Sequence, residues 1–178
     1  MRNSDEVQVL CEQLLALSVA RDVKIAVAES LTGGLLAAAL VSVPGASRAF
    51  AGGVVAYDTA LKHTLLGVEA GILRERGPVD AEVARQMARG VRAACAVPGR
   101  PGGVDLGIAT TGVAGPDPDP QSGQPAGVVW IAVSFGDESC TEQLTLTGDR
   151  GTIRAASVAA ALRVAIDVLL AADRRNMT

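Results

Sequence analysis

Three side chains in the first third of the chain could perform chemistry together: Ser30, Tyr57 and Lys62. Ser30 follows a short apolar run and precedes Thr32, Gly33 and Gly34, after which an apolar helix begins. A serine where a strand turns into a helix lies beside free backbone N–H groups, which suits an exposed nucleophile or an oxyanion or phosphate site. The structural alternative is that Ser30 or Thr32 only caps the helix, while the glycines allow close packing.

Lys62 is the candidate base for this serine. The only histidine, His63, sits in a predicted helix without a paired acid nearby, so a Ser-His-Asp arrangement is not indicated. Lys62 is one of two lysines, with Lys24, and a desolvated lysine loses its proton more easily and can serve as a general base. The alternative is an ordinary solvated surface lysine.

Tyr57 lies at the end of a predicted strand, and the pair Thr111-Gly112 follows another. If the strand that ends at Tyr57 neighbours the strand before Ser30, Tyr57 and Lys62 reach the same crevice at the carboxyl ends of the strands. The alternative for this lone tyrosine is a place in the core. Thr111 and Gly112 begin a turn that could donate backbone N–H groups to an anion or amide, although a single Gly-x-x-Gly turn is a weak signal.

The hydrophobic pattern predicts one domain over residues 1–178, built as a three-layer α/β/α sandwich. Its sheet is expected to be mixed, mostly parallel and of about five strands, the last two forming a hairpin. The predicted strands span residues 23–28, 52–57, 104–110, 127–135 and 141–147. The predicted helices span residues 4–17, 32–43, 59–67, 80–95 and 152–172, with a loop over residues 74–78.

Composition excludes several classes of function. The net charge is −3, no basic run exceeds two residues and only four residues are aromatic, so a nucleic-acid partner is not expected. Three distant cysteines and one histidine indicate no metal site and no disulfide framework. The most apolar uncharged stretch, residues 35–43, is too short for a membrane span. We therefore expect a cytoplasmic protein without a membrane partner.

Five separated motifs together resemble the carboxy-terminal domain of the competence/damage-inducible CinA proteins, which also occurs alone as the nicotinamide-nucleotide amidase. The resemblance extends from about residue 5 to residue 170, in the order of the family. The matching residues are Ala28-Glu29-Ser30 with Thr32-Gly33-Gly34, Tyr57 with Lys62, Gly112-Val113-Ala114-Gly115-Pro116, Gly127-Val128-Val129-Trp130 and Gly148-Asp149-Arg150.

The resemblance implies a hydrolase that converts nicotinamide mononucleotide to nicotinate mononucleotide and ammonia, without a metal or other cofactor. By analogy, Ser30 attacks the carboxamide carbon and Lys62 takes the hydroxyl proton. Tyr57 orients these groups or relays the proton. Backbone N–H groups near Thr32-Gly33 or Gly112 would hold the oxyanion. Arg150 is the first candidate for the substrate phosphate, and the helix start at Gly33-Gly34 is the second.

The chain departs from the family pattern at three places. Leu31 replaces a frequent cysteine, Asp58-Thr59 replaces a Ser-Asn pair, and Thr111 replaces the commoner serine. These changes keep an alternative open, namely a catalytically silent module that binds nucleotide or protein. A DNA-acting competence factor is disfavoured by the acidic net charge. The apolar first and last helices could bury a face in a homodimer.

Overall fold

A five-stranded mixed sheet forms the middle layer of the computed structural model, which describes residues 3–100 and 103–176. The strands are ordered β2-β1-β3-β4-β5. Two neighbouring pairs are parallel and two are antiparallel, so β4 alone runs against the other strands. The predicted mixed sheet and the terminal hairpin are therefore confirmed. The strands are β1 (Ile25–Glu29), β2 (Phe50–Val55), β3 (Leu106–Gly112), β4 (Val128–Phe135) and β5 (Glu138–Thr145).

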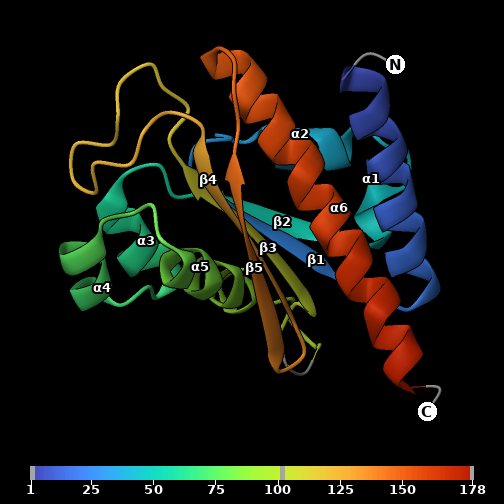
Figure 1. Ribbon diagram of the computed structural model, residues 1–178. Coiled ribbons are helices and arrows are strands. Elements are labelled where there is room, and N and C mark those ends of the chain that lie inside the picture. The colour runs from blue at the N-terminus through green and yellow to red at the C-terminus, as the bar shows by residue number, and fades with distance from the viewer. Residues whose placement is uncertain (1–2, 101–102, 177–178) are drawn as a thin grey trace.

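Helices cover both faces of the sheet, which confirms the predicted three-layer architecture (Figure 1). The helices on one face are α1 (Asn3–Ala20), α2 (Leu35–Val41) and α6 (Arg150–Asn176). Those on the other face are α3 (Thr59–Leu66), α4 (Ala70–Arg76) and α5 (Ala81–Ala94). A short 3₁₀ turn, Ala46–Arg48, precedes β2.

Strand β1 presents large side chains to one helical layer and small side chains to the other. Its side chains alternate between the two faces of the sheet, as the period of a strand requires. Ile25 and Val27 belong to the large aliphatic core beneath α1 and α6, whereas Ala26 and Ala28 face the α5 layer. The small residues let the α5 layer approach the sheet closely, which an aromatic-poor sequence makes possible.

One predicted loop is wrong. Residues 74–78 were expected to lack regular structure, but Arg74 and Arg76 belong to the last turn of α4. The helix-favouring run from Ile72 to Arg76 outweighs the weak start at Gly71, and Gly77, with φ of 77°, ends the helix. The helix is only two turns long, which is too short for a clear hydrophobic period.

Helix α6 contains one stretch, Arg150–Ala172, that is long and apolar enough to cross a membrane. Half of this stretch is buried in the fold, where it packs on α1 and β4. The core helices of globular proteins have the same composition, so length and hydropathy are weak evidence for a span.

Helix α3 packs closely against α5 at a glycine, Gly90. A Cβ atom at Gly90 would lie 1.8 Å from the backbone oxygen of Leu66, the last residue of α3. A similar constraint acts where α5 meets the sheet, because a Cβ at Gly107 would lie 1.9 Å from the Ala88 carbonyl oxygen. These two contacts set how closely α3 approaches the rest of the domain.

We expect Gly90→Ala to destabilise the fold by about 1–3 kcal/mol, since the methyl group can be accommodated only by moving backbone. Gly71→Ala is the matched control, because the nearest atom to its added Cβ is the end of the Arg74 side chain at 4.0 Å. That helical change should be neutral or stabilising by up to about 1 kcal/mol. Urea titration of both variants makes the comparison, and equal free energies of unfolding would contradict the packing argument.

Candidate active site

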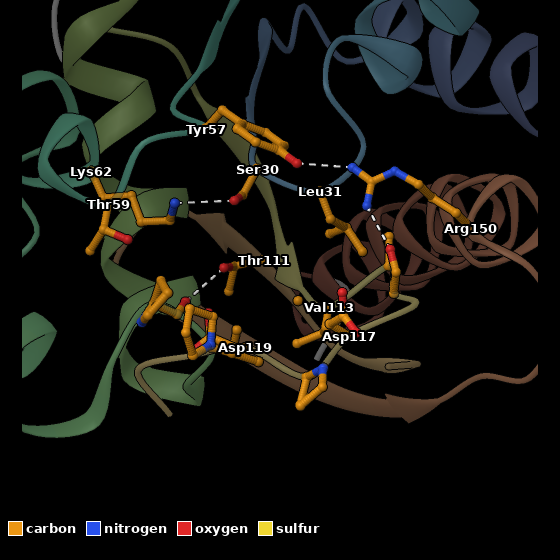
Figure 2. Close-up of a pocket in the computed structure, with 17 residues that line it drawn as sticks. Ser30, Leu31, Tyr57, Thr59, Lys62, Thr111, Val113, Asp117, Asp119 and Arg150 are labelled. Carbon is orange, nitrogen blue, oxygen red and sulfur yellow. Dashed lines mark hydrogen bonds between the residues drawn. The ribbon is translucent and has the colours of Figure 1, made fainter. Parts of the chain in front are cut away.

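Ser30 lies at the exit of β1, in the tight turn that leads into α2 (Figure 2). Gly33 and Gly34 both adopt positive φ, at 56° and 94°, which lets the chain reverse within four residues. The Ser30 N–H still donates to the Thr110 carbonyl on β3, at 2.9 Å. The predicted strand-turn-helix unit is confirmed, and α2 begins at Leu35 rather than at Thr32.

The carboxylate of Glu29 closes the turn and caps α2. This side chain is fully buried and accepts three hydrogen bonds from the backbone N–H groups of Gly34, Leu36 and Ala37, at 3.0, 3.0 and 2.8 Å. A carboxylate at this place satisfies the N–H groups at the start of a helix and interacts favourably with its dipole. Neither Ser30 nor Thr32 provides the cap, so the alternative in which one of these side chains caps the helix is wrong.

Sequence reasoning assigns Glu29 no role of its own within its motif. The available signal was an acidic residue at the end of an otherwise apolar strand, since such a buried charge needs donors nearby. Thr32 is also buried, and its hydroxyl is 2.7 Å from that of Thr110. This side chain therefore belongs to the interior of the turn.

Lys62 points from α3 into the interior, toward Ser30. Asp58 caps α3 by accepting from the Ala60 N–H at 2.8 Å, and the orientation of the helix places Lys62 on its buried face. The Lys62 ammonium donates to Ser30 Oγ at 3.1 Å and to the Ala56 carbonyl at 2.8 Å. The side chain is 1% exposed, so the alternative of a solvated surface lysine is wrong.

Burial lowers the pKa of the Lys62 ammonium from its ordinary value of 10.5 to about 8. The negative charges of Asp58 and Asp119 act in the opposite direction and raise this pKa, but the loss of hydration is larger. A substantial fraction of the molecules therefore carries a neutral amine near pH 8. That amine can accept the proton of the serine hydroxyl it touches.

The contact between Ser30 and Lys62 forms the inner wall of a cavity of about 240 Å³ (Figure 2). Six of the nine residues proposed from the sequence line this cavity: Ser30, Tyr57, Lys62, Thr111, Gly112 and Arg150. Thr32, Gly33 and Gly34 are absent from its lining. The Gly33 and Gly34 N–H groups are already bonded, to the Ser30 carbonyl and the Glu29 carboxylate.

Tyr57 and Arg150 meet at the rim of the cavity. Arg150, the first residue of α6, donates to the Tyr57 hydroxyl and to the Gly115 carbonyl, each at 2.9 Å. Tyr57 is 59% exposed, so the alternative of a core tyrosine is wrong. Its hydroxyl points toward Arg150, and in the described chain no hydrogen bond joins it to Ser30 or Lys62 (Figure 2).

The opposite wall is built from the end of β3 and the loop after it. The Thr111 hydroxyl donates to the Pro78 carbonyl at 2.7 Å, which ties this wall to the segment before α5. Gly112 must be a glycine, since a Cβ would lie 2.6 Å from the Val128 carbonyl oxygen. Asp117 and Asp119 also line the cavity and were not proposed from the sequence. Loops without a hydrophobic period give no residue-level signal.

His63 lies outside this cavity, and its Nδ1 is 2.8 Å from the Val68 carbonyl oxygen. Across residues 3–100 and 103–176, no group of three or more His, Cys, Asp and Glu side chains could hold a metal ion. The chemical groups that line this site include the hydroxyls of Ser30 and Tyr57, the amine of Lys62, the carboxylates of Asp117 and Asp119 and the guanidinium of Arg150.

Residues 7–169 match the model of the CinA C-terminal domain, and the chain belongs to this family. It is 43% identical over 165 residues to a CinA-like protein of Frankia casuarinae, which covers 93% of this chain and 36% of that protein. A putative competence-damage inducible protein of Desulforudis audaxviator is 42% identical over 148 residues, covering 83% and 34%. The chain thus spans about a third of the length of these curated relatives.

Solved structures of the CinA superfamily share the fold over nearly their whole length. One from Klebsiella pneumoniae is 30% identical with a TM-score of 0.85, covering 92% of this chain and 98% of that one. One from Escherichia coli is 29% identical with a TM-score of 0.84, covering 96% and 93%.

The buried lysine leads to a prediction about stability. The pKa of Lys62 is lower in the folded chain than the ordinary 10.5, so the unfolded chain binds more protons between pH 8 and 10.5. Stability therefore rises with pH across that window, and below it the buried ammonium costs as much as about 3 kcal/mol. We expect Lys62→Met to be more stable than the parent protein near pH 7, with a gain that shrinks toward pH 10.

Urea titrations at a series of pH values measure this difference. Lys24→Met is the control for the loss of one positive charge, because Lys24 lies at the other end of β1 and is partly exposed. A gain from Lys62→Met that stays constant from pH 7 to pH 10 would show that burial does not shift the pKa of Lys62.

Proposed function

We propose that the domain is an amidohydrolase in which Ser30 is the nucleophile and Lys62 is its general base. One observation carries this proposal: a buried lysine amine, with its pKa lowered to about 8, touches the serine hydroxyl at 3.1 Å inside a cavity. Nucleophile and base lie within hydrogen-bond reach, as covalent catalysis by a serine requires.

The chemistry proceeds in two balanced halves. Ser30 Oγ bonds to the carboxamide carbon while its proton moves to the neutral Lys62 amine, and the carbonyl electron pair moves onto oxygen. The ammonium then protonates the leaving nitrogen, so that ammonia departs and an ester with Ser30 remains. Water next attacks this ester, giving its proton to Lys62, and the carboxylic acid leaves as Ser30 regains a proton.

Nicotinamide mononucleotide is the proposed substrate, as the resemblance to the family implies. The cavity offers a cation for its phosphate at the rim, because Arg150 bonds only Tyr57 and Gly115 among the described residues and has further N–H donors available. The other proposed phosphate site, the helix start at Gly33-Gly34, is supported less well. Glu29 occupies that helix start, and neither glycine lines the cavity.

The departures at Asp58 and Thr59 keep one alternative open, a silent module that binds nucleotide without turnover. Thr59 lines the cavity, so this position is available to contact a ligand. Asp58 caps α3 and holds the pKa of Lys62 higher than burial alone would set it. Neither change removes the contact between Ser30 and Lys62, which supports the enzyme.

Ser30→Ala and Lys62→Met should each lower kcat/KM for ammonia release from nicotinamide mononucleotide by at least about 10³-fold, since each removes a group that acts in the chemical step. Release is followed by coupling ammonia to glutamate dehydrogenase, and circular dichroism verifies the fold. Lys24→Met should retain the parental rate. Full activity in either site variant would refute the proposed pair, and nucleotide binding by an inactive parent would support the silent module.

The pH dependence tests the role of the lysine separately. We expect kcat/KM to rise with pH and to level off above about pH 8, following deprotonation of Lys62. Asp58→Asn should move this limb to lower pH, because it removes a negative charge that raises the pKa of Lys62, while asparagine still caps the helix.

Asp80→Asn is the matched control, since Asp80 caps α5 in the same way and is not among the charges that shift Lys62. Its pH profile should coincide with that of the parent protein. A profile that is unmoved in Asp58→Asn would contradict the assignment of the limb to Lys62.

A further inference from the structure

Arg154 reaches from α6 to the turn that carries Ser30. Its Nε donates to the Leu31 carbonyl at 2.9 Å and its Nη2 donates to the Thr32 carbonyl at 2.8 Å. No carboxylate of the described residues forms an ion pair with it. The positive charge of this half-buried guanidinium is therefore directed at two peptide groups next to the nucleophile.

These contacts start a series of hydrogen bonds through the turn. The Thr32 carbonyl, held by Arg154, shares its peptide group with the Gly33 N–H, which donates to the Ser30 carbonyl at 3.1 Å. The Ser30 carbonyl shares its peptide group with the Leu31 N–H, which has no acceptor within the described ranges. Peptide groups are planar, and hydrogen bonds in series polarise one another.

The series ends at the cavity. Leu31 lines the cavity beside Ser30, on the side facing α6 (Figure 2). In strand-turn-helix sites, the N–H of the residue after the nucleophile is a usual donor to the oxyanion. The glycine at position 33 lets the guanidinium approach, because a Cβ there would lie 3.3 Å from Arg154 Nη2.

We propose that Arg154 is a positioning residue that orients and polarises the Leu31 N–H as the oxyanion donor of this site. The inference rests on the proposed amidase function. As Ser30 Oγ bonds to the carboxamide carbon and its proton moves to Lys62, negative charge develops on the carbonyl oxygen. The Leu31 N–H stabilises that charge, and Arg154 strengthens the donor from two peptide groups away. Arg154 does not contact the substrate.

A purely structural role for Arg154 would give different kinetics. Glu29 already anchors the helix end of the turn through the Gly34 N–H, so the turn has a second, independent support. Loss of transition-state stabilisation lowers kcat and leaves KM unchanged, whereas a distorted site alters substrate binding as well. The ratio of the two effects therefore distinguishes the roles.

The test compares Arg154→Met with Arg163→Met in the full chain, using nicotinamide mononucleotide. Arg163 lies on the same helix, is half exposed and pairs with Glu6, so its loss controls for removing a guanidinium from α6. Arg154→Met should lower kcat by about 10- to 100-fold, less than the direct loss of an oxyanion donor, with KM changed less than about twofold. Arg163→Met should match the parent protein.

Chemical rescue tests whether the guanidinium group itself accounts for the lost kcat. Added ethylguanidinium should restore part of the kcat of Arg154→Ala, whose short side chain leaves room for it, whereas ethylammonium, which lacks the two-pronged donor, should not. If Arg154→Met does not fold, Arg154→Lys replaces it, with the same loss of kcat at constant KM expected. Parental kcat in a folded Arg154 variant, or a rise in KM that accounts for the whole loss, would overturn this inference alone. A parent protein inactive on the nucleotide would overturn the proposed function with it.

Discussion

The buried carboxylate of Glu29 is the interaction on which the site depends. It joins the end of β1 to the first turn of α2 through three backbone N–H groups, and the turn it closes carries Ser30. A charge this deeply buried is stable only because the helix start supplies donors that water would otherwise provide. Replacing it would leave these N–H groups of α2 unpaired and would weaken the connection between β1 and α2. The nucleophile is thus placed by a strand, a cap and a helix, rather than by a flexible loop.

The second constraint is the close packing of small residues on the face of the sheet that α5 covers. Alanines on β1 and glycines at Gly90 and Gly107 let α5 and then α3 lie against the sheet. This packing drives Lys62 into the interior, where the only hydrogen-bond partners of its amine in the described chain are Ser30 and Ala56. Burial costs stability at neutral pH, and the same burial lowers the pKa that makes the amine a base. The shortage of aromatic residues is therefore connected to the chemistry of the site.

Much of the fold followed from the sequence, because long periodic segments and turn residues mark the strands, the hairpin and the capped helices α3 and α5. The two-turn helix α4 escaped prediction, since it is too short for a hydrophobic period. Tyr57 and Lys62 stand out in the sequence because the chain has one tyrosine and two lysines. Only the structure shows that Lys62 is buried against Ser30 and that Tyr57 is exposed beside Arg150. Glu29, Arg154 and Asp117 could not be assigned from sequence, because their roles depend on backbone groups and walls contributed by distant segments. The roles proposed for Thr32, Gly33 and Gly34, the homodimer and the cytoplasmic location stay predictions.

The most direct test of the account is a titration of the Lys62 amine itself. The chain contains only two lysines, so a protein labelled with ¹³C-lysine gives two Cε signals, and Lys24→Met assigns them. The account predicts that the Lys62 signal titrates with a pKa of about 8, well below its ordinary 10.5. A Lys62 signal that titrates near 10.5 would show an amine that is still almost wholly charged at pH 8, and it would contradict the role of Lys62 as the base for Ser30.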